Sequence, residues 1–265
     1  MNAFCLPRVL CALVCALLIG GLPAFDRIAV FYWAPAAEIV SAEHPIAKGT
    51  APKPEPGKIA PAKPKAAKSA KPSKESEIQS AVKRFEGEGR DVFQKRYEIL
   101  GVCQLKPGMD VADIGAGTGL FTRLFAPQVL PGGKVYAIDV SKQYVDYIVD
   151  TCRKQKIDNV VGITCTPDAV GLPPGSIDLA FVCDTYHHFN HPEKNLASIH
   201  QALRPGGRLI IVEFKKEKGA TPDWVMKHVR PDRQMLIKEV TDAGFTLLDE
   251  PPLMKMQQVY RFQKK

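Results

Sequence analysis

The sequence predicts an α/β fold in which a doubly wound, mostly parallel sheet carries helices on both faces. Helix-like and strand-like segments alternate at regular intervals from residue 77 onward, which is typical of strands joined by crossover helices. The last two strand-like segments are joined too closely for a parallel return, which needs about a dozen residues or more. We therefore expect seven strands, with the last one inserted antiparallel.

The first half of this domain is expected to begin with a helix over residues 77–100, interrupted at Gly87 and Gly89. A turn at residues 106–108 (Lys-Pro-Gly) then leads into a short buried strand. Ser141 is a typical helix N-cap residue. The elements expected after the turn are a strand at 111–114, a helix at 118–125, a strand at 134–140, a helix from Ser141 to about 155 and a strand at 160–165.

The second half is expected to continue the same alternation. A turn at residues 204–207 (Arg-Pro-Gly-Gly) separates a helix from a strand, and Gly244 ends the final helix. The expected elements are a strand at 178–184, a helix at 193–203, a strand at 208–214, a helix at 232–243 and two strands at 245–249 and 256–262.

Residues 1–36 are predicted to be a signal peptide or a membrane anchor. Arg8 is followed by an uncharged apolar run over residues 9–22, which is shorter than the roughly 20 residues of a membrane span and suits the apolar part of a signal peptide. Residues 34–36 (Ala-Pro-Ala) have the small-x-small form that signal peptidase prefers. An uncleaved anchor, with possible membrane association, is the alternative.

Residues 37–74 are predicted to be a disordered linker rich in Lys, Pro and Ala. Residues 48–74 hold eight Lys against a single Glu and almost no large apolar side chain, so they cannot bury enough surface to fold. The net charge of the whole chain is +8, but residues 75–265 carry only +2. This excludes a basic nucleic-acid-binding domain and leaves residues 75–265 as the enzyme or binding domain.

A glycine-rich loop follows the first strand of the sheet. The run Asp113-Ile-Gly115-Ala-Gly117-Thr-Gly119 allows close approach of a ligand to the backbone. A dinucleotide fingerprint has the spacing GxGxxG, whereas the third glycine here comes one residue early. This spacing and the acidic Asp113 favour a ligand with an ammonium group over a pyrophosphate.

Further carboxylates come near the ends of the following strands, where open α/β sheets bind ligands. Asp139 ends the second strand and suits the two hydroxyls of a ribose. Asp168 follows the third strand, where it would accept from an adenine amino group while the Ala169 N–H donates to the ring. Asp184 ends the fourth strand. Each Asp alone is equally consistent with a cap or turn residue, but four of them on successive strands indicate one site.

Together these segments resemble the class I S-adenosylmethionine-dependent methyltransferases. The resemblance rests on VADIGAGTG, Asp139, Pro167-Asp168-Ala169, Cys183-Asp184 and LRPGGRLIIVEF, and it spans about residue 85 to the C-terminus. It implies a class I methyltransferase-like Rossmann fold and S-adenosyl-L-methionine as the cofactor. The chain also looks like a subgroup with FEGEGR, DTYHHF and HVR.

Histidines supply the candidate catalytic residues. His187 and His188 follow Asp184, and one of them, with Tyr186 and helped by His228 and Arg230, is predicted to act as a base or orienting group at the substrate face. A polar loop without catalytic function is the alternative. A metal site is not predicted, because adjacent histidines on one turn usually point in different directions.

The predicted function is methyl transfer from S-adenosylmethionine to a small or lipid-like molecule. Methyl transfer depends mainly on proximity and orientation, which suits a site with well-defined cofactor residues and variable catalytic ones. The alternatives are an NAD-dependent oxidoreductase, which the glycine spacing disfavours, and a non-catalytic, envelope-tethered binding domain with the same fold. Neither the acceptor nor the oligomeric state can be deduced from the sequence.

The leader further predicts that the domain is exported to the cell envelope or periplasm. Basic residues within about 15 to 20 positions of an apolar span keep their side of it in the cytoplasm. After residue 22 that window holds only Arg27, against Arg8 on the other side, so the rest of the chain is expected to cross. If residues 28–40 also insert, the lysines that follow would instead retain the domain at the cytoplasmic face of the membrane.

A reporter that is active only outside the cytoplasm, fused after Lys74, is therefore expected to be active. Normal expression of a silent reporter would place the domain inside. A fusion that lacks residues 1–36 is the matched control, and it should be silent.

Overall fold

The computed structural model describes residues 73–219 and 221–265. The predictions for the leader, 1–36, and for the linker, 37–74, therefore lie outside the described residues, apart from the linker's last two positions. Ser73 caps the first helix, α1 (Lys74–Phe85), by accepting a hydrogen bond from the backbone N–H of Ser76. Among the described residues no helix is long and apolar enough to cross a membrane.

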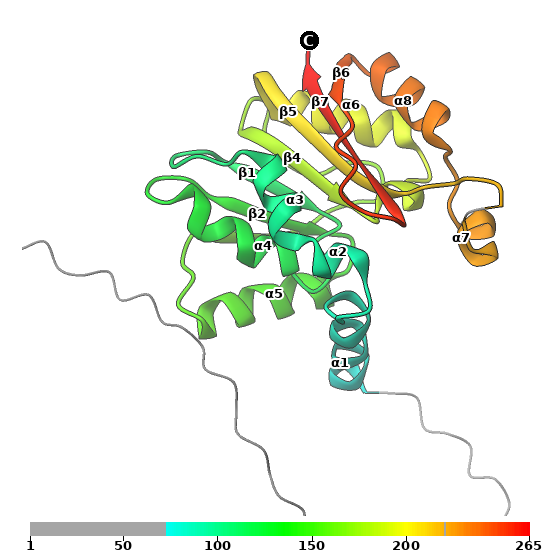
Figure 1. The fold of residues 1–265 in the computed structure, drawn as a ribbon. Coiled ribbons are helices and arrows are strands. Elements are labelled where there is room, and N and C mark those ends of the chain that lie inside the picture. The colour runs from blue at the N-terminus through cyan, green and yellow to red at the C-terminus, as the bar shows by residue number, and fades with distance from the viewer. Residues whose placement is uncertain (1–72, 220) are drawn as a thin grey trace, which may run out of the picture. The chain divides into compact units, whose positions relative to one another are not determined.

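A seven-stranded sheet forms the centre of the domain, with the strand order β3-β2-β1-β4-β5-β7-β6 (Figure 1). The first five strands are parallel to one another, and β7 is antiparallel to both β5 and β6, as the sequence predicts. The strands are β1 (Val111–Ile114), β2 (Val135–Asp139), β3 (Val160–Thr164), β4 (Ile177–Cys183), β5 (Leu203–Phe214), β6 (Phe245–Asp249) and β7 (Gln257–Lys264).

Helices cover both faces of the sheet, because side chains that alternate along each strand point to opposite sides. In β4, for example, Ala180 and Val182 belong to one apolar core, and Phe181 belongs to the other. The first core contains residues of α6 and α8, and the second contains residues of α2, α3 and α4. The helices are α2 (Asp91–Gln94), α3 (Arg96–Cys103), α4 (Leu120–Phe125), α5 (Lys142–Lys154), α6 (Pro192–Ala202), α7 (Asp223–His228) and α8 (Arg233–Asp242).

The helix expected over 77–100 is interrupted around Gly87 and Gly89, as predicted, and it is divided into α1, α2 and α3. Two other local features differ from the sequence prediction for physical reasons. Strand β5 begins at Leu203 instead of 208, because Leu203 pairs with Ile177 and the predicted turn becomes an irregularity within the ladder. Short 3-10 turns at Ala126–Val129 (η1) and Tyr186–His188 (η2), as well as α7, are too short to have a clear periodicity.

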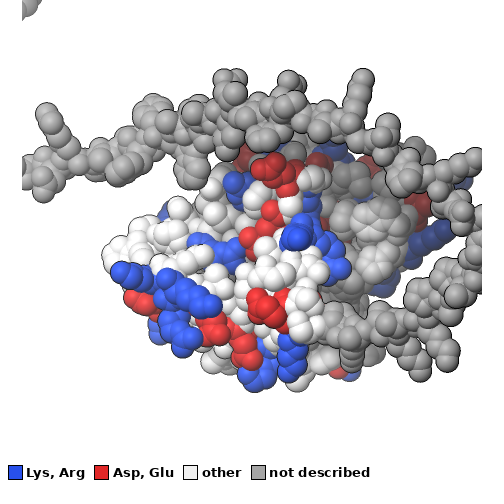
Figure 2. Space-filling model, turned by 90° about the horizontal axis from the view of Figure 1, so that it is seen from below, with Lys and Arg blue, Asp and Glu red and all other residues white. Residues whose placement is uncertain are grey.

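Charges of both signs are interspersed on the surface of the domain. In Figure 2, basic and acidic side chains lie next to one another with uncharged surface between them. Several of the described ion pairs join two residues of one helix, such as Lys142 with Asp146 and Arg153 with Asp150. This distribution agrees with the small net charge of residues 75–265.

Candidate active site

A cavity of about 1090 Å³ opens at the carboxyl ends of the parallel strands. Segments that follow β1, β2, β3 and β4 line it, and residues from α1, α7 and the start of β7 complete its wall. The strand order changes direction between β1 and β4, which is where open α/β sheets form a binding crevice. Its volume is sufficient for a drug-sized ligand, which occupies cavities of about 300 to 1,000 Å³.

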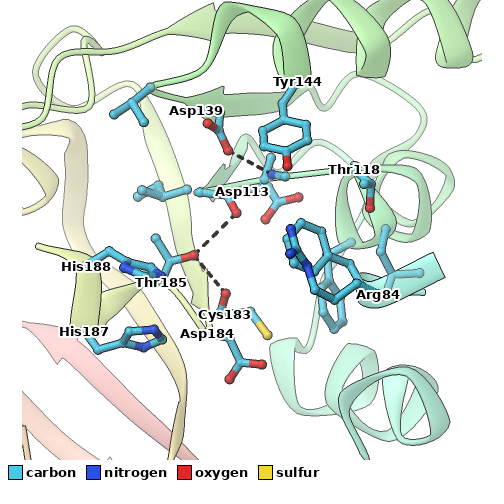
Figure 3. Close-up of a pocket in the computed structure, with 18 of the residues that line it drawn as sticks. Arg84, Asp113, Thr118, Asp139, Tyr144, Cys183, Asp184, Thr185, His187 and His188 are labelled. Carbon is cyan, nitrogen blue, oxygen red and sulfur yellow. Dashed lines mark hydrogen bonds between the residues drawn. The ribbon is translucent and has the colours of Figure 1, made fainter. Parts of the chain in front are cut away.

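The glycine-rich loop after β1 lies against the end of β4. Gly115 has a φ of +70°, and a Cβ added there would lie 2.3 Å from Cγ2 of Thr185. The Thr185 hydroxyl in turn donates to the carbonyl of Cys183 over 2.9 Å (Figure 3). Any side chain at position 115 would displace this threonine from the floor of the cavity. Gly117 also lines the cavity, whereas Gly119 does not and instead packs toward Ile148 of α5.

Asp139 lies at the end of β2, as predicted, and lines the cavity. One carboxylate oxygen accepts the N–H of Gly117 over 3.0 Å (Figure 3). The other accepts the N–H of Ser141 over 2.8 Å. Each carboxylate oxygen has a second lone pair, so both can also accept a ribose hydroxyl. The carboxylate thus connects the glycine-rich loop with the start of α5. Ser141 occupies the predicted N-cap position, but its side chain makes no capping hydrogen bond.

Asp113 is buried beneath the glycine-rich loop and lines the cavity. Burial raises the pKa of its carboxyl to about 6, although the hydroxyl of Thr122, which donates to it over 2.6 Å, acts in the opposite direction. A cationic ligand would offset the cost of ionising this group. This environment agrees with the prediction of a ligand that carries an ammonium group.

Asp184 follows β4 and has a left-handed backbone conformation, with a φ of +44°. Its side chain is 8% exposed and forms an ion pair with Arg90 from the segment before α2. Burial raises its pKa to about 6, while Arg90 lowers it. Asp184 lines the cavity, and one of its carboxylate oxygens, Oδ1, is buried without a hydrogen-bond partner.

The predicted adenine contacts are placed differently from the other carboxylates. Asp168 does not line the cavity but pairs with Lys194 of α6 over 3.1 Å. The Ala169 N–H faces the carbonyl of Thr166 over 3.5 Å. Their neighbours Thr166 and Pro167 do line the cavity, so this loop still borders it. The role of Asp168 and Ala169 toward adenine remains a prediction.

The four candidate catalytic residues separate into two groups. His187, His188 and His228 line the cavity, and burial, together with His187 and His228, lowers the pKa of His188. Tyr186 does not line it. Its side chain is buried in the core, and its hydroxyl donates to Glu239 of α8 over 2.6 Å. This corrects the placement of Tyr186 at the substrate face.

Arg230, expected to assist there, also binds Glu239, at 2.6 and 2.8 Å. Tyr186 and Arg230 therefore join η2 to α8 and have a structural role. The expectation that adjacent histidines diverge is also wrong here, because the ring centroids of His187 and His188 are 4.1 Å apart.

Several cavity residues had no binding or catalytic role assigned to them from the sequence. Phe85 lies at the end of α1, with its ring 6.4 Å from that of Tyr144 in α5, and Arg90 donates to the Phe85 carbonyl over 2.8 Å. On the side of β5 and α7, Phe214 and Trp224 contact each other edge to face, with centroids 5.2 Å apart. Phe85 and Arg90 belong to the FEGEGR segment, which is a recognisable sequence pattern. Phe214 and Trp224 are single aromatic residues, and no sequence pattern indicates that they line the cavity.

The sequence of this chain is similar to those of known methyltransferases. The family described as "Methyltransferase domain" matches residues 112–211. A ubiquinone/menaquinone biosynthesis C-methyltransferase from Bordetella avium is 29% identical over 138 residues, which are 50% of this chain and 52% of that protein. Its counterpart from Hydrogenovibrio crunogenus is 31% identical over 123 residues, covering 46% of this chain and 48% of the other.

A solved structure resembles the domain over a longer span. The S-adenosylmethionine-dependent methyltransferase from Aquifex aeolicus is 26% identical and has a TM-score of 0.63, and the match covers 70% of this chain and 98% of that one. These similarities support a class I S-adenosylmethionine-dependent methyltransferase.

One further solved structure has the same fold but a different name. The [4+2]-cyclase SpnF, at 16% identity and a TM-score of 0.57, matches 65% of this chain and 80% of its own and shares the fold alone. The chain also spans only about half the length of the curated relatives that it matches.

The cavity fits S-adenosylmethionine, the cofactor that these similarities imply. Asp139, Gly115, Gly117 and Asp113, all predicted to bind the cofactor, line this cavity, and their individual contacts with it stay predictions. When bound, this cofactor supplies a methyl group on a positively charged sulfur.

We expect Asp139→Ala to weaken the binding of S-adenosylmethionine by about 1 to 3 kcal/mol, because a charged acceptor for the ribose and the anchor of Gly117 are lost together. Isothermal titration calorimetry of the full chain measures this change. Asp146→Ala, an exposed Asp of α5, is the matched control. Unchanged affinity of the Asp139 variant would remove the ribose assignment.

We also expect Gly115→Ala to reduce cofactor affinity at least tenfold, because the new methyl group would collide with Thr185. Gly175 has a similar positive φ of +60° but open space where its Cβ would lie. Gly175→Ala therefore carries the same backbone strain without the collision. Equal affinities of the two variants would show that the approach of Gly115 to Thr185 does not matter for binding.

Proposed function

We propose that this chain transfers the methyl group of S-adenosylmethionine to a small, ring-bearing hydroxylated acceptor, such as a phenol or a quinol. The observation that carries the proposal is one cavity in which carboxylates and a glycine-rich loop lie near aromatic side chains and histidines. Its volume of about 1090 Å³ leaves room for an acceptor beside the cofactor.

The acceptor is proposed to bind on the side of the cavity that η2 and α7 form. In Figure 3, His187 and His188 lie on the opposite side of the view from Tyr144 and Thr118. Phe214 and Trp224 supply apolar surface there, and an exposed fraction of 54% leaves the Trp224 ring accessible. Aromatic side chains bind flat rings through offset or edge contacts, which supports an aromatic acceptor.

The chemistry requires little of the protein beyond orientation and charge. The acceptor attacks the methyl carbon in line with the carbon–sulfur bond, whose electron pair moves to sulfur, and the acceptor loses a proton. Cavity residues hold the reacting atoms close together, which accounts for most of the acceleration in such displacements. The apolar wall keeps water away from the methyl group. The names of the matched curated relatives, which refer to quinones, support an acceptor of this class.

Neither alternative function is supported by a specific feature of the cavity. An NAD-dependent oxidoreductase needs a pyrophosphate site, whereas Asp113 and Asp184 place negative charge near the loop. A non-catalytic binding domain with the same fold would bind a ligand without transferring a methyl group. These differences make both alternatives distinguishable in one experiment.

The test incubates the full chain with S-adenosylmethionine labelled in its methyl group and, separately, with a short-tailed demethylated quinol, a catechol and an amine as a chemically different acceptor. We expect label in the quinol or the catechol but not in the amine. Asp139→Ala should lower transfer about 5- to 150-fold at limiting cofactor, in line with its binding loss. Asp146→Ala should retain full transfer.

Two outcomes would contradict the proposal. Preferential binding of NAD over S-adenosylmethionine would overturn the activity itself. Tight binding of S-adenosylmethionine without transfer to either hydroxylated acceptor would overturn the acceptor class and favour a binding domain.

A further inference from the structure

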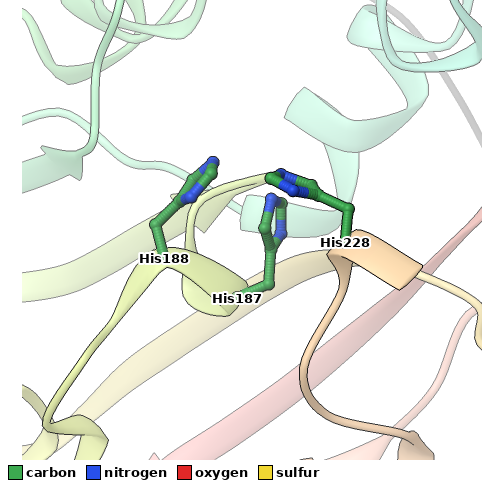
Figure 4. Close-up of side chains that lie close together, drawn as sticks. All are labelled: His187, His188 and His228. Carbon is green, nitrogen blue, oxygen red and sulfur yellow. The ribbon is translucent and has the colours of Figure 1, made fainter. Parts of the chain in front are cut away.

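Three histidines from two separate segments of the chain lie close together in the cavity. His187 and His188 rise from η2, and His228 comes from the C-terminal end of α7 (Figure 4). The His228 ring centroid lies 5.0 Å from that of His187 and 5.2 Å from that of His188. One ring nitrogen from each residue lies within 4.8 Å of the others.

A buried carboxylate fixes the orientation of the central imidazole. Nδ1 of His187 lies 2.9 and 3.0 Å from the two carboxylate oxygens of Glu213 in β5, and these two side chains are only 3% and 1% exposed. Because a carboxylate only accepts, the neutral form of this imidazole has its proton on Nδ1 and its lone pair on Nε2. The backbone N–H groups of His187 and Phe214 also donate to Glu213, over 3.0 and 2.8 Å, which holds the carboxylate in place.

This arrangement is the one by which proteins orient a metal-binding histidine. Ligating histidines usually donate their second ring N–H to a carboxylate or carbonyl, which sets the tautomer and the direction of the bare nitrogen. A structural role alone would not require two further imidazoles at the same point. In the part of the chain that the structure describes, no Lys or Arg pairs with Glu213, so its charge is available to balance a cation.

We propose that His187, His188 and His228 bind one divalent transition-metal ion at the acceptor side of the cavity, with Glu213 as the orienting residue. Imidazole ligands suit zinc, iron, nickel or copper, and three of them leave open coordination positions, as in catalytic zinc sites. Metal–nitrogen bonds of about 2.0 to 2.1 Å bring tetrahedral ligand atoms to roughly 3.3 Å from one another. The ring nitrogens now lie within 4.8 Å of one another and would have to move closer to reach this separation. His188 and His228 are exposed and can rotate toward the ion, while Glu213 keeps His187 in place.

The role of this ion rests on the proposed function. An acceptor hydroxyl would occupy an open coordination position, and its proton would pass to solvent because the ion stabilises the oxyanion. The bound oxyanion makes a phenolic ring a stronger nucleophile at oxygen or at the neighbouring carbon. The site therefore favours acceptors with a ring hydroxyl over amines.

The first test measures metal binding without cofactor or acceptor, so its result does not depend on methyl transfer. Tag-free full chain is freed of metal with a chelator, and Co²⁺ or Zn²⁺ is then added. We expect about one ion per chain after gel filtration, and visible absorption typical of Co²⁺ with nitrogen ligands.

Variants locate the ion. His187→Ala, His188→Ala and His228→Ala should each weaken Zn²⁺ binding by at least about 100-fold, and Glu213→Gln by about 10- to 100-fold. His191→Ala, an exposed histidine of the same segment that does not line the cavity, is the matched control and should bind normally. S-adenosylmethionine affinity close to that of the unaltered chain shows that a variant is folded.

Absence of retained Co²⁺ and Zn²⁺, or binding that survives in all three histidine variants, would overturn the site. A second measurement addresses its role: Zn²⁺ should raise the affinity of the full chain for a catechol at least tenfold, and not in His228→Ala. Equal catechol affinity with and without Zn²⁺ would remove the acceptor role even where the metal site stands.

Discussion

The cavity depends on the close approach of two strand ends. Gly115 follows β1 and Thr185 follows β4, and the threonine side chain occupies the space where a residue other than glycine would place its Cβ. These neighbouring parallel strands lie where the strand order reverses, so the connections that leave them diverge and leave a crevice. The positions of Asp113 and Asp184 at this crevice result from that arrangement, because each lies within two residues of the contact.

Negative charge concentrated in and beneath the cavity connects the two proposals. Asp113, Asp184 and Glu213 are all largely buried, and each has a different partner: the Thr122 hydroxyl, the Arg90 guanidinium and the His187 imidazole. Burial raises the pKa of Asp113 and of Asp184 to about 6, which shows that ionisation there is incompletely compensated. A positively charged ligand offsets that deficit. Both a sulfonium cofactor and a divalent ion have the required sign.

Segments outside the parallel core complete the cavity. Phe85 at the end of α1 lies over Gly117, where a Cβ would be in ordinary contact with its ring. Arg90 holds this segment by its bonds to the Phe85 carbonyl and to Asp184. On another side, α7 brings His228 and Trp224 to the histidines of η2 and to Phe214. The glycine-rich loop and the histidines of η2 are thus each in contact with a segment that is distant in sequence.

The sequence by itself determined the parallel sheet, its antiparallel last strand and the placement of Asp113, Asp139 and Asp184 at one edge. It could do so because hydrophobic alternation and turn residues are local signals, and because parallel strands bring their carboxyl ends to one side. Only the tertiary structure decided which way individual side chains point. Tyr186 turns into the core toward Glu239, whereas its neighbours His187 and His188 turn into the cavity and meet His228. Asp168 likewise turns away from the cavity, because it pairs with Lys194. These orientations depend on partners 26 to 53 residues away along the chain, and no local pattern encodes such contacts.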